Sequence, residues 1–408
     1  MAVFFDWRIV GVIVLAAVLR AAVVRAERPR LLLNALLGLG VIASLHPVFA
    51  VVVLACCGAV HRLVATRDRM RPGWGGMFVP CLVLCLTVLG IGKYGPPAME
   101  RLFEGETGIL AVIGMPLGLS YFAFRLLQYA FDHVRGVIKE TSLLHLVSFV
   151  CFLPTFPAGP IETYSGFHGG ALGDPTTEST MRGLHRIVIG YVKKTVLGDL
   201  VLLQLMEPFG RSVTDLASGA IAEMPPEECA QFVILAFIRA YVDLSAYTDL
   251  AVGFAMLLGH RVMENFDRPL WRRNLADFWR SWHISLSMWC RNNVYFPVFG
   301  ATRKAWVGLY ASMLVMGLWH YVNWNWFSWA VYHGSGLIAV SRFAQWSRKK
   351  KPVKRTMNKP VVVAISSIVT FLYVALGYSF VATPDFPTAL RVFAGALSAP
   401  FSFLEGLL

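Results

Sequence analysis

Three stretches without a charged side chain constrain the fold of this chain more than any other feature. Residues 31–60, 305–341 and 361–384 contain no Lys, Arg, Asp or Glu. Apolar stretches of about 18 or more residues are long enough to cross a bilayer as helices. Only 15% of all residues are charged, against about 25% in an average soluble domain. We therefore predict an all-α polytopic membrane protein, because runs this long and apolar exclude a transmembrane barrel.

The basic residues indicate how the chain is threaded through the membrane. The formal net charge is +13, and the bases concentrate in joints between apolar runs, as expected for cytoplasmic loops. This pattern explains the charge without nucleic acid. The joints expected in the cytoplasm are residues 25–30, 61–72, 125–140, 260–273 and 342–355. An acidic loop at 207–228 fits the external side, and the N-terminus is predicted to lie outside.

This threading predicts roughly 11 spanning or re-entrant helices in a multi-pass protein. We interpret the first apolar run, Ile9–Val24, as a span and not as a cleaved signal peptide. A single membrane domain is expected over residues 1–408, with N-terminal spans at 1–92, a core at 108–341 and C-terminal spans at 361–408.

One apolar segment, Leu143–Ile161, is interrupted by residues that break helices. Pro154, Pro157 and Pro160 stand close together, with Gly159 before the last of them. Proline lacks an N–H donor, and irregular backbone inside a membrane persists only where protein or a cavity satisfies its polar groups. We expect a re-entrant or bent segment that lines a cavity, with an ordinary kinked span as the alternative.

Two histidines, His283 and His320, stand in otherwise apolar, Trp-rich segments. Ionisable side chains inside a membrane are costly, so each suggests a functional site. A neutral imidazole can act as a general base near neutral pH. Polar Arg280 and Ser285 accompany His283, which favours a shared cavity, although a structural histidine bonded across helices is the alternative for both. We interpret His333 as structural.

Several common catalytic patterns are missing from the sequence. There is no GxSxG elbow for a serine nucleophile, no GxxxxGK[ST] phosphate loop and no HExxH motif. The seven cysteines form no CxxC pair, and we interpret them as small buried hydrophobic residues. We expect no metal site and no bound cofactor, which favours direct base-assisted transfer in a membrane cavity.

Six segments, taken in order, carry a family resemblance. They include FLPTFPAGPIETY at 152–164, FWRSWHISLSMW at 278–289 and GLWH at 317–320. The others are residues 118–140, 241–271 and 377–397. Together they resemble the membrane-bound O-acyltransferase family, in particular its bacterial branch of alginate O-acetylation subunits and teichoic-acid D-alanyl transferases.

The resemblance implies a curved wall of helices around a transmembrane tunnel, with the core at 108–341 as the catalytic part. It matches His320 to the family's catalytic histidine and His283 to a second polar position. His320 would deprotonate or orient an acceptor hydroxyl for attack on a thioester, and His283 would position substrate or polarise the acyl carbonyl. The residues that we expect to line the substrate tunnel are Trp279, Arg280, Ser285, Trp319, Asn323, Pro154 and Gly159.

The resemblance also implies the substrates and partners. The acyl donor would be a thioester of carrier-protein phosphopantetheine or of coenzyme A, on the cytoplasmic side of a bacterial inner membrane. The acceptor would be an extracytoplasmic polysaccharide or a partner acyltransferase. We favour acetyl as the acyl group, with D-alanyl as the alternative. An acidic carrier would suit the bases of Arg67–Arg71, 260–273 and 342–355.

The sequence departs from the family pattern at two positions. Tyr321 stands where glycine commonly follows the catalytic histidine, and Asn292 stands where aspartate is common. Tyr321 would narrow the cavity. Two other functions remain compatible with the sequence. A transporter or polymer-export channel would also have many spans and buried histidines, and an acyl relay would hand its group to a separate extracytoplasmic transferase.

Overall fold

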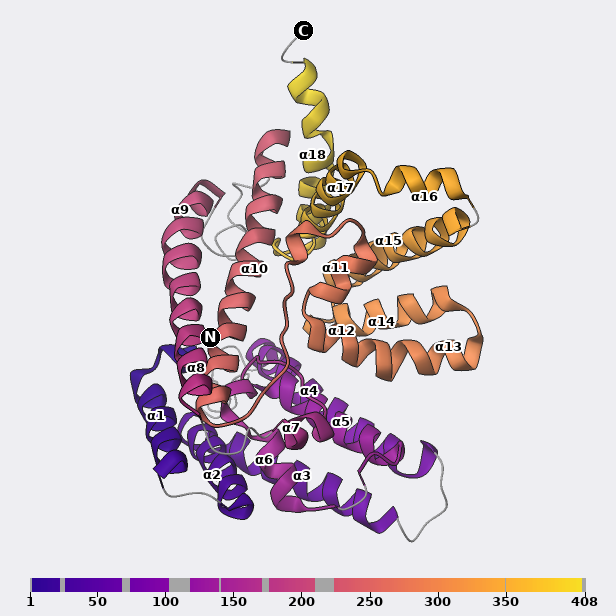
Figure 1. Ribbon diagram of the computed structural model, residues 1–408. Helices are drawn as coiled ribbons and strands as arrows, with labels where there is room; N and C mark the ends of the chain where they lie inside the picture. The colour runs from indigo at the N-terminus through magenta and orange to yellow at the C-terminus, as the bar shows by residue number, and fades with distance from the viewer. Residues whose placement is uncertain are drawn as a thin grey trace. The chain divides into compact units, whose positions relative to one another are not determined.

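The computed structural model is built from helices (Figure 1). It describes residues 2–22, 26–67, 74–102, 118–138, 141–170, 176–209, 224–348 and 350–405. The helices before residue 260 are α1 (Trp7–Ala22), α2 (Glu27–Leu45), α3 (Pro47–Arg67), α4 (Trp74–Leu102), α5 (Leu119–Val134), α6 (Leu143–Val150), α7 (Tyr164–Gly169), α8 (Thr177–Val192), α9 (Leu203–Met206) and α10 (Pro226–Leu257).

Several of the helices after residue 260 are short. The helices of this part of the chain are α11 (Leu275–Ser281), α12 (Ile284–Cys290), α13 (Phe296–Thr302), α14 (Ala305–His320), α15 (Trp324–Arg348), α16 (Lys351–Met357), α17 (Pro360–Gly377) and α18 (Phe386–Glu405). π-helical turns cover Lys193–Leu202 and Arg291–Tyr295. No strand occurs within the described ranges, where the one β-type pairing is an isolated bridge between Phe266 and Trp282.

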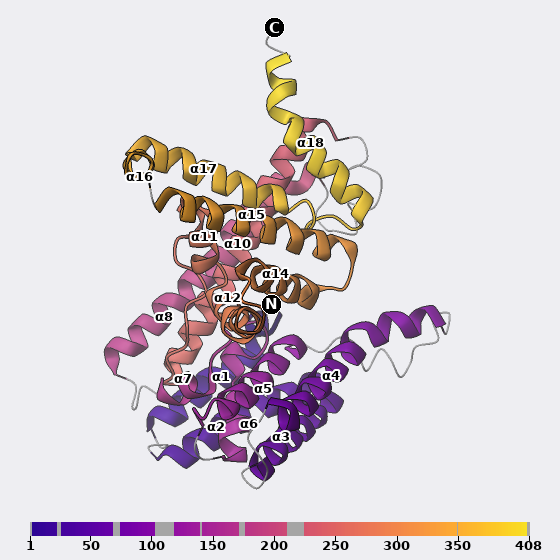
Figure 2. The same ribbon diagram turned by 90° about the vertical axis from the view of Figure 1, so that its right-hand side faces the viewer.

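The chain forms two compact units. Unit 1 comprises Met1–Gly190 and Tyr247–Met263, and unit 2 comprises Tyr191–Ala246 and Glu264–Leu408. Unit 1 therefore holds α1 to α7 and most of α8, whereas unit 2 holds α9 and α11 to α18, and α10 contributes to both. Within unit 2, Figures 1 and 2 both show α15 between α14 and α17.

Several helices have the length and composition of membrane spans. In the described part of the chain, four are long and apolar enough to cross a bilayer, namely Glu27–Leu45, Pro47–Thr66, Pro226–Leu257 and Pro360–Gly377. Two shorter apolar helices, Val79–Gly95 and Ala305–His320, accompany them. The prediction of an all-α polytopic membrane protein is therefore confirmed.

The finer topology stays a prediction, including the roughly 11 segments and the single domain over residues 1–408. Some of its parts lie outside the described residues. These parts are 108–117 of one predicted span, 210–223 of the acidic loop, 23–24 of the first apolar run, and, in the basic joints, residues 25, 68–72, 139–140 and 349.

In unit 1, the proline-rich segment interrupts the helix as its sequence predicts. α6 ends at Val150, and a 3-10 turn follows at Leu153–Thr155. Arg125 of α5 is 1% exposed, and its guanidinium donates to the carbonyl oxygens of Phe149 and Val150, each at 2.9 Å. It also donates to the hydroxyl of Thr155. A buried arginine thus satisfies carbonyl groups that a broken helix leaves open.

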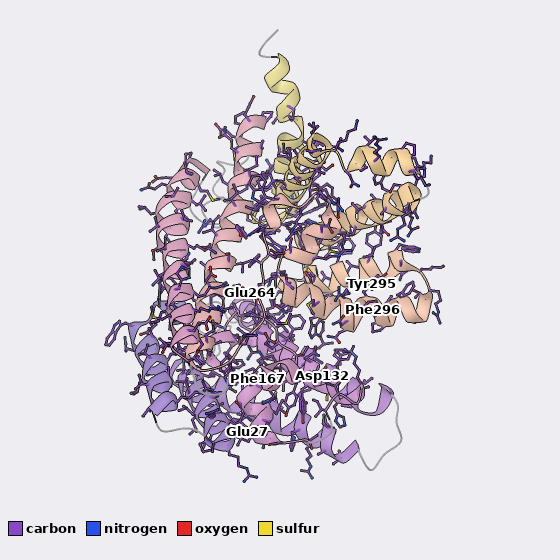
Figure 3. All side chains as sticks on the ribbon, viewed as in Figure 1. Glu27, Asp132, Phe167, Glu264, Tyr295 and Phe296 are labelled. Atoms are coloured by element: carbon purple, nitrogen blue, oxygen red, sulfur yellow. The ribbon has the colours of Figure 1, made fainter. Side chains whose placement is uncertain are left out.

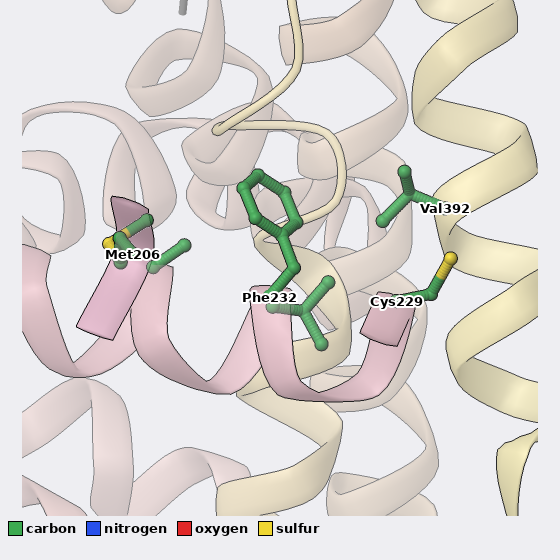
Figure 4. Close-up of a cluster of buried hydrophobic side chains, with 6 residues drawn as sticks. Met206, Cys229, Phe232 and Val392 are labelled. Atoms are coloured by element: carbon green, nitrogen blue, oxygen red, sulfur yellow. The ribbon is translucent and has the colours of Figure 1, made fainter. Parts of the chain in front are cut away.

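In unit 2, one hydrophobic cluster joins α10 to α9 and α18 (Figure 4). Cys229 and Phe232 of α10 pack with Met206 of α9 and Val392 of α18, and all four side chains are buried. A Cβ atom at Gly395 of α18 would lie 2.7 Å from the sulfur of Cys229. Glycine is therefore needed where these helices approach, as small residues are at helix contacts in membranes.

A buried histidine links α2 to the segment that follows α10 in unit 1. Nε2 of His260 lies 2.9 Å from Nδ2 of Asn34, and the imidazole stacks on Phe167 with ring centroids 4.7 Å apart. Figure 3 labels Phe167, which belongs to α7. Burial, followed by the charge of Arg20 and by His168, lowers the pKa of His260 to about 3. The folded protein therefore holds this imidazole neutral near neutral pH.

We predict that acid destabilises the protein partly through His260. The pKa of His260 in the folded protein lies below its value in the unfolded chain, which is about 6.5. The stability that neutral His260 contributes is therefore fully present at pH values above about 6.5. This stability is lost as the pH falls toward about 3. Between about pH 6 and pH 5, the unfolding free energy of the wild type should fall by up to about 1.4 kcal/mol per pH unit more than that of His260→Gln.

Thermal unfolding in detergent at a series of pH values measures this difference. His185→Gln, which changes an exposed histidine of α8, is the matched control and should keep the wild-type slope. Identical pH slopes for the wild type and His260→Gln would contradict the prediction.

Candidate functional site

His320 is the last residue of α14, in unit 2. Tyr321 is extended (φ −162°, ψ 143°), so the helix stops at the histidine. The half-buried imidazole stacks on Trp326 with centroids 4.2 Å apart and 12° between the planes. It also contacts the ring of Trp319 at 4.5 Å. Two tryptophans thus orient the imidazole at the end of its helix.

The chain returns from α14 into α15 through a tight connection. Oδ1 of Asn323 accepts a hydrogen bond from the N–H of Trp326 at 2.9 Å, as an N-cap side chain does. A Cβ atom at Gly317 would lie 2.7 Å from the carbonyl oxygen of Trp326 and 3.1 Å from Cβ of Ala330. Asn323 therefore starts α15, and Gly317 lets α14 and α15 approach closely beside His320.

His283 lies at the bend between α11 and α12. Its backbone is left-handed (φ 43°, ψ 54°), and its side chain makes no capping hydrogen bond to α12. The carbonyl oxygen of His283 accepts from the N–H of Ser287 at 3.0 Å. The residue is only 6% exposed. The chain thus buries an imidazole at a sharp turn between two short helices.

A cavity of about 500 Å³ lies within unit 2. Its walls come from α11, α12, the π-helical turn, α14 and α15. The lining is mainly apolar and includes three methionines, and its polar side chains include two arginines and two serines. These residues are Met288, Met313, Met316, Arg280, Arg291, Ser287 and Ser312. Tyr295, labelled in Figure 3, lines it from the end of the π-helical turn.

The segments that carry the two histidines also supply walls of this cavity. On α14, Met313 and Met316 line the cavity, and His320 follows one turn later on the same side, because residues three or four apart share a helix face. On α12, the lining residue Ile284 directly follows His283. Neither imidazole is itself among the lining residues. Both histidines thus belong to segments that wall one cavity, and their contact with a substrate stays a prediction.

The other predicted tunnel residues are distributed unevenly. Trp279 and Arg280 line the cavity, whereas Ser285, Trp319 and Asn323 do not. Pro154 and Gly159 belong to unit 1, where the first lies in the 3-10 turn and the second packs against Thr155. Contact between any of these predicted tunnel residues and a substrate stays a prediction.

Aromatic rings support the cavity wall at Trp279. The indole of Trp279 meets the rings of Trp329 and His333 edge to face, with centroids 5.6 and 5.4 Å apart. His333 is 1% exposed. It also packs against Tyr373 at 6.0 Å. These contacts agree with a packing role for His333, as the sequence indicates.

Arg280, which lines the cavity, forms an ion pair with an aspartate on the same helix. Nη1 of Arg280 lies 2.6 Å from Oδ1 of Asp277, one turn earlier on α11. The side chain of Arg280 is 69% exposed, so this ion pair contributes little to stability. Within the described ranges, no group of three or more His, Cys, Asp or Glu side chains is placed to hold a metal ion.

Asn265, which no sequence pattern singles out, is hydrogen-bonded to Ser285 beside His283. Asn265 is 3% exposed, and its Oδ1 accepts from the N–H and the hydroxyl of Ser285, at 3.2 and 2.7 Å. The segment 241–271 contains Asn265 and carries part of the family resemblance. No spacing rule, however, connects an asparagine to a serine on another element, so the pairing could not be read from the sequence.

Comparison with known proteins supports the resemblance. The model of the membrane-bound O-acyltransferase family matches residues 119–381. The probable alginate O-acetylase AlgI of Pseudomonas aeruginosa is 28% identical over 355 residues, which cover 83% of this chain and 62% of the relative. The teichoic acid D-alanyltransferase of Streptococcus thermophilus is 29% identical over 257 residues, 60% of each chain.

A third relative is the peptidoglycan O-acetyltransferase of Helicobacter pylori, which is 26% identical over 349 residues, 77% of this chain and 63% of the relative. The chain thus spans about six tenths of the length of the curated relatives it matches.

We predict that the approach of α14 to α15 does not tolerate a side chain at Gly317. In Gly317→Ala the new Cβ atom would press on the backbone of α15, so the unfolding free energy should fall by about 1–3 kcal/mol. The matched control is Gly300→Ala in α13, where a Cβ atom would meet nothing within 4 Å. The control should be neutral or slightly stabilising. Thermal unfolding of the purified variants measures both, and equal Tm values would contradict the prediction.

Proposed function

The chain belongs to the membrane-bound O-acyltransferase family, and on that premise we propose that it is an O-acyltransferase. It moves a small acyl group, with acetyl favoured, from a cytoplasmic thioester to a hydroxyl of an extracytoplasmic polysaccharide. The relatives named as alginate O-acetylase and peptidoglycan O-acetyltransferase support acetyl transfer to a polymer. In this proposal it is a multi-pass protein of a bacterial inner membrane, and its N-terminus lies outside.

One observation carries the assignment of the reaction to unit 2. The cavity of about 500 Å³ is walled by the two elements whose ends bear His320 and His283. Each histidine was selected from the sequence as a costly polar group in an apolar segment. Two histidines on segments that wall one cavity support a shared catalytic site better than two unrelated packing roles.

In the proposed reaction, His320 is the general base. Its imidazole accepts the proton of the acceptor hydroxyl as the oxygen attacks the thioester carbonyl. The tetrahedral intermediate then collapses, the carbon–sulfur bond breaks, and the imidazolium returns the proton to the leaving thiolate. The tryptophans against His320 hold the ring in one orientation, which reduces the entropy cost of reaching the attack geometry.

His283 has the second role in this proposal. It positions the substrate or donates a hydrogen bond to the acyl carbonyl as negative charge develops there. The cavity's mainly apolar walls, which include Trp279, limit the access of water to the thioester, and Arg280 adds a charged group to the lining. The protein itself binds no cofactor, because the thioester arrives on the donor, either carrier phosphopantetheine or coenzyme A.

Three alternatives remain as second candidates. The resemblance to a teichoic acid D-alanyltransferase favours D-alanyl as the acyl group, and the mass added to the polymer distinguishes it from acetyl. An acyl relay would load a separate extracytoplasmic acyltransferase, so deleting that partner would leave the polymer unmodified. A transporter or export channel would change the amount of exported polymer and not its acyl content.

We predict that His320→Gln abolishes most acylation. Glutamine keeps hydrogen-bonding groups but cannot take a proton at neutral pH, so the rate should fall by about 10²- to 10⁴-fold. Mass spectrometry of isolated surface polysaccharide, normalised to the amount of protein in the membrane, measures the loss. His185→Gln, which changes an exposed residue of α8, is the control. A folded, abundant His320→Gln variant with wild-type acylation would show that the mechanism is wrong.

We further predict that an acidic carrier docks on the joint 342–355. Arg348, Lys350, Lys351 and Arg355 are exposed there, whereas Arg67 lies at the edge of residues that the structure does not describe. In 260–273, Arg272 and Arg273 lie beside carboxylates, at 2.6 Å from Asp267 and 3.5 Å from Asp277. Changing these four bases to Gln should raise KM for acetyl-loaded acyl carrier protein about fivefold or more at low salt, and less at high salt.

The turnover number in that variant should stay near the wild-type value, because the cavity is unchanged. A double Arg8→Gln, Arg391→Gln variant, which alters exposed bases predicted to lie on the outer side, is the control. An unchanged KM for the loaded carrier would contradict docking at this joint.

A further inference from the structure

His283 has a backbone conformation that is uncommon for a residue other than glycine. Its φ is 43°, in the left-handed region where a Cβ atom crowds the backbone. Among the described residues, the other non-glycine positions with positive φ are Arg268 and Arg303. Such strained residues persist only where surrounding structure holds them, and they gather at functional sites. The structure around His283 should therefore contain the element that holds it.

That element is a second segment of the chain, residues 265–267, which runs antiparallel to 281–284. The N–H of Ile284 donates to the carbonyl oxygen of Asn265 at 2.9 Å, and the N–H of Asp267 donates to that of Ser281 at 3.0 Å. Phe266 and Trp282 form the bridge between these two bonds. We call residues 265–267 the strap. Its hydrogen bonds fix the backbone on both sides of His283.

The side chain of Asn265 supplies the cap that the residue at the N-cap position of α12, His283, does not provide. His283 is the N-cap residue of α12 but provides no side-chain cap. An N-cap side chain usually accepts from the N–H groups at the start of its helix. Here Oδ1 of Asn265 accepts from the N–H and the hydroxyl of Ser285 instead, at 3.2 and 2.7 Å. Asn265 thus caps α12 from another segment of the chain.

This arrangement leaves the imidazole of His283 outside the capping network. Its Nδ1 is buried and has no hydrogen-bond partner in the described part of the chain. We propose that Asn265 is a positioning residue for acyl transfer, because it caps α12 in place of His283 and so keeps the imidazole available to the reacting groups. This inference rests on the proposed function. Asn265 acts on the reaction through His283 and does not touch the substrate.

The first test uses Ser285, where two variants of nearly equal shape separate the hydrogen bond from packing. Ser285→Thr keeps the hydroxyl that donates to Asn265, whereas Ser285→Val removes it. Because both variants add similar bulk at Ser285, we expect the Ser285→Val rate to be about tenfold or more below the Ser285→Thr rate, since small displacements of a reacting group are costly. Mass spectrometry of the isolated surface polysaccharide, normalised to folded protein, gives the rates. Equal rates for the two variants overturn the proposal.

The second test is a double-mutant cycle between Asn265 and His283. Glycine tolerates positive φ, so His283→Gly removes the imidazole without straining the turn. Asn265→Ala alone should lower the rate about 10- to 100-fold. In the His283→Gly background the same change should cost no more than about twofold, because effects exerted through one residue are not additive. A full additional loss there shows that Asn265 only supports the fold, and overturns the proposal.

A matched control separates positioning from loss of a buried hydrogen bond as such. Ser379 is fully buried, and its hydroxyl donates to the carbonyl oxygen of Leu376 at 2.9 Å. Ser379→Ala therefore removes a comparable bond elsewhere in unit 2 and should leave acylation per folded protein unchanged. Wild-type rates in both His283→Gly and His320→Gln refute the proposed function itself. Loss in those two with wild-type rates in Asn265→Ala refutes the positioning role alone.

Discussion

Inside a membrane, every backbone group that leaves a regular helix must find its partner within the protein. Side chains complete several helix ends in the described part of this chain, and three of them lie at turns that matter here. Arg125 serves the carbonyl groups at the end of α6, Asn265 serves the N–H groups at the start of α12, and Asn323 serves the start of α15. Arg125 and Asn265 are buried and Asn323 is exposed, and each allows the chain to turn where a continuous helix would otherwise have to run on.

These turns create the space in which the candidate site lies. α11, α12 and α13 are short, and the segment Arg291–Tyr295 is a π-helical turn. Short helices that change direction cannot fill the volume beside α14 as one straight helix would, and a cavity of about 500 Å³ results. The capping side chains thus offset the free-energy cost of breaking the helices. The broken helices leave a cavity beside the segments that carry the two histidines.

Much of the architecture could be predicted from the sequence, because hydropathy and proline act locally. The charge-free runs at 31–60 and 361–384 correspond to apolar helices of spanning length. The break near Pro154 occurs where proline forbids a helix. His283 and His320 could be selected because an imidazole is rare in such segments. By contrast, the cap between Asn265 and Ser285 could not be predicted, since it depends on how two segments meet in space. Asn323 was likewise expected in a tunnel, yet its Oδ1 caps α15.

The two histidines stand at opposite kinds of helix end, and this difference suits the roles proposed for them. His320 ends α14, where the partial negative charge of the helix C-terminus favours a cation, and so favours the imidazolium that forms when a base takes a proton. His283 precedes α12, where the partial positive charge of the N-terminus favours an anion, such as the oxyanion of a tetrahedral intermediate. A base at a C-terminus and a positioning group at an N-terminus would therefore stabilise the two charges that develop together in acyl transfer. Reversing the two roles would place each charge against the field of its own helix, which adds a physical argument to the family resemblance for proposing His320 as the base.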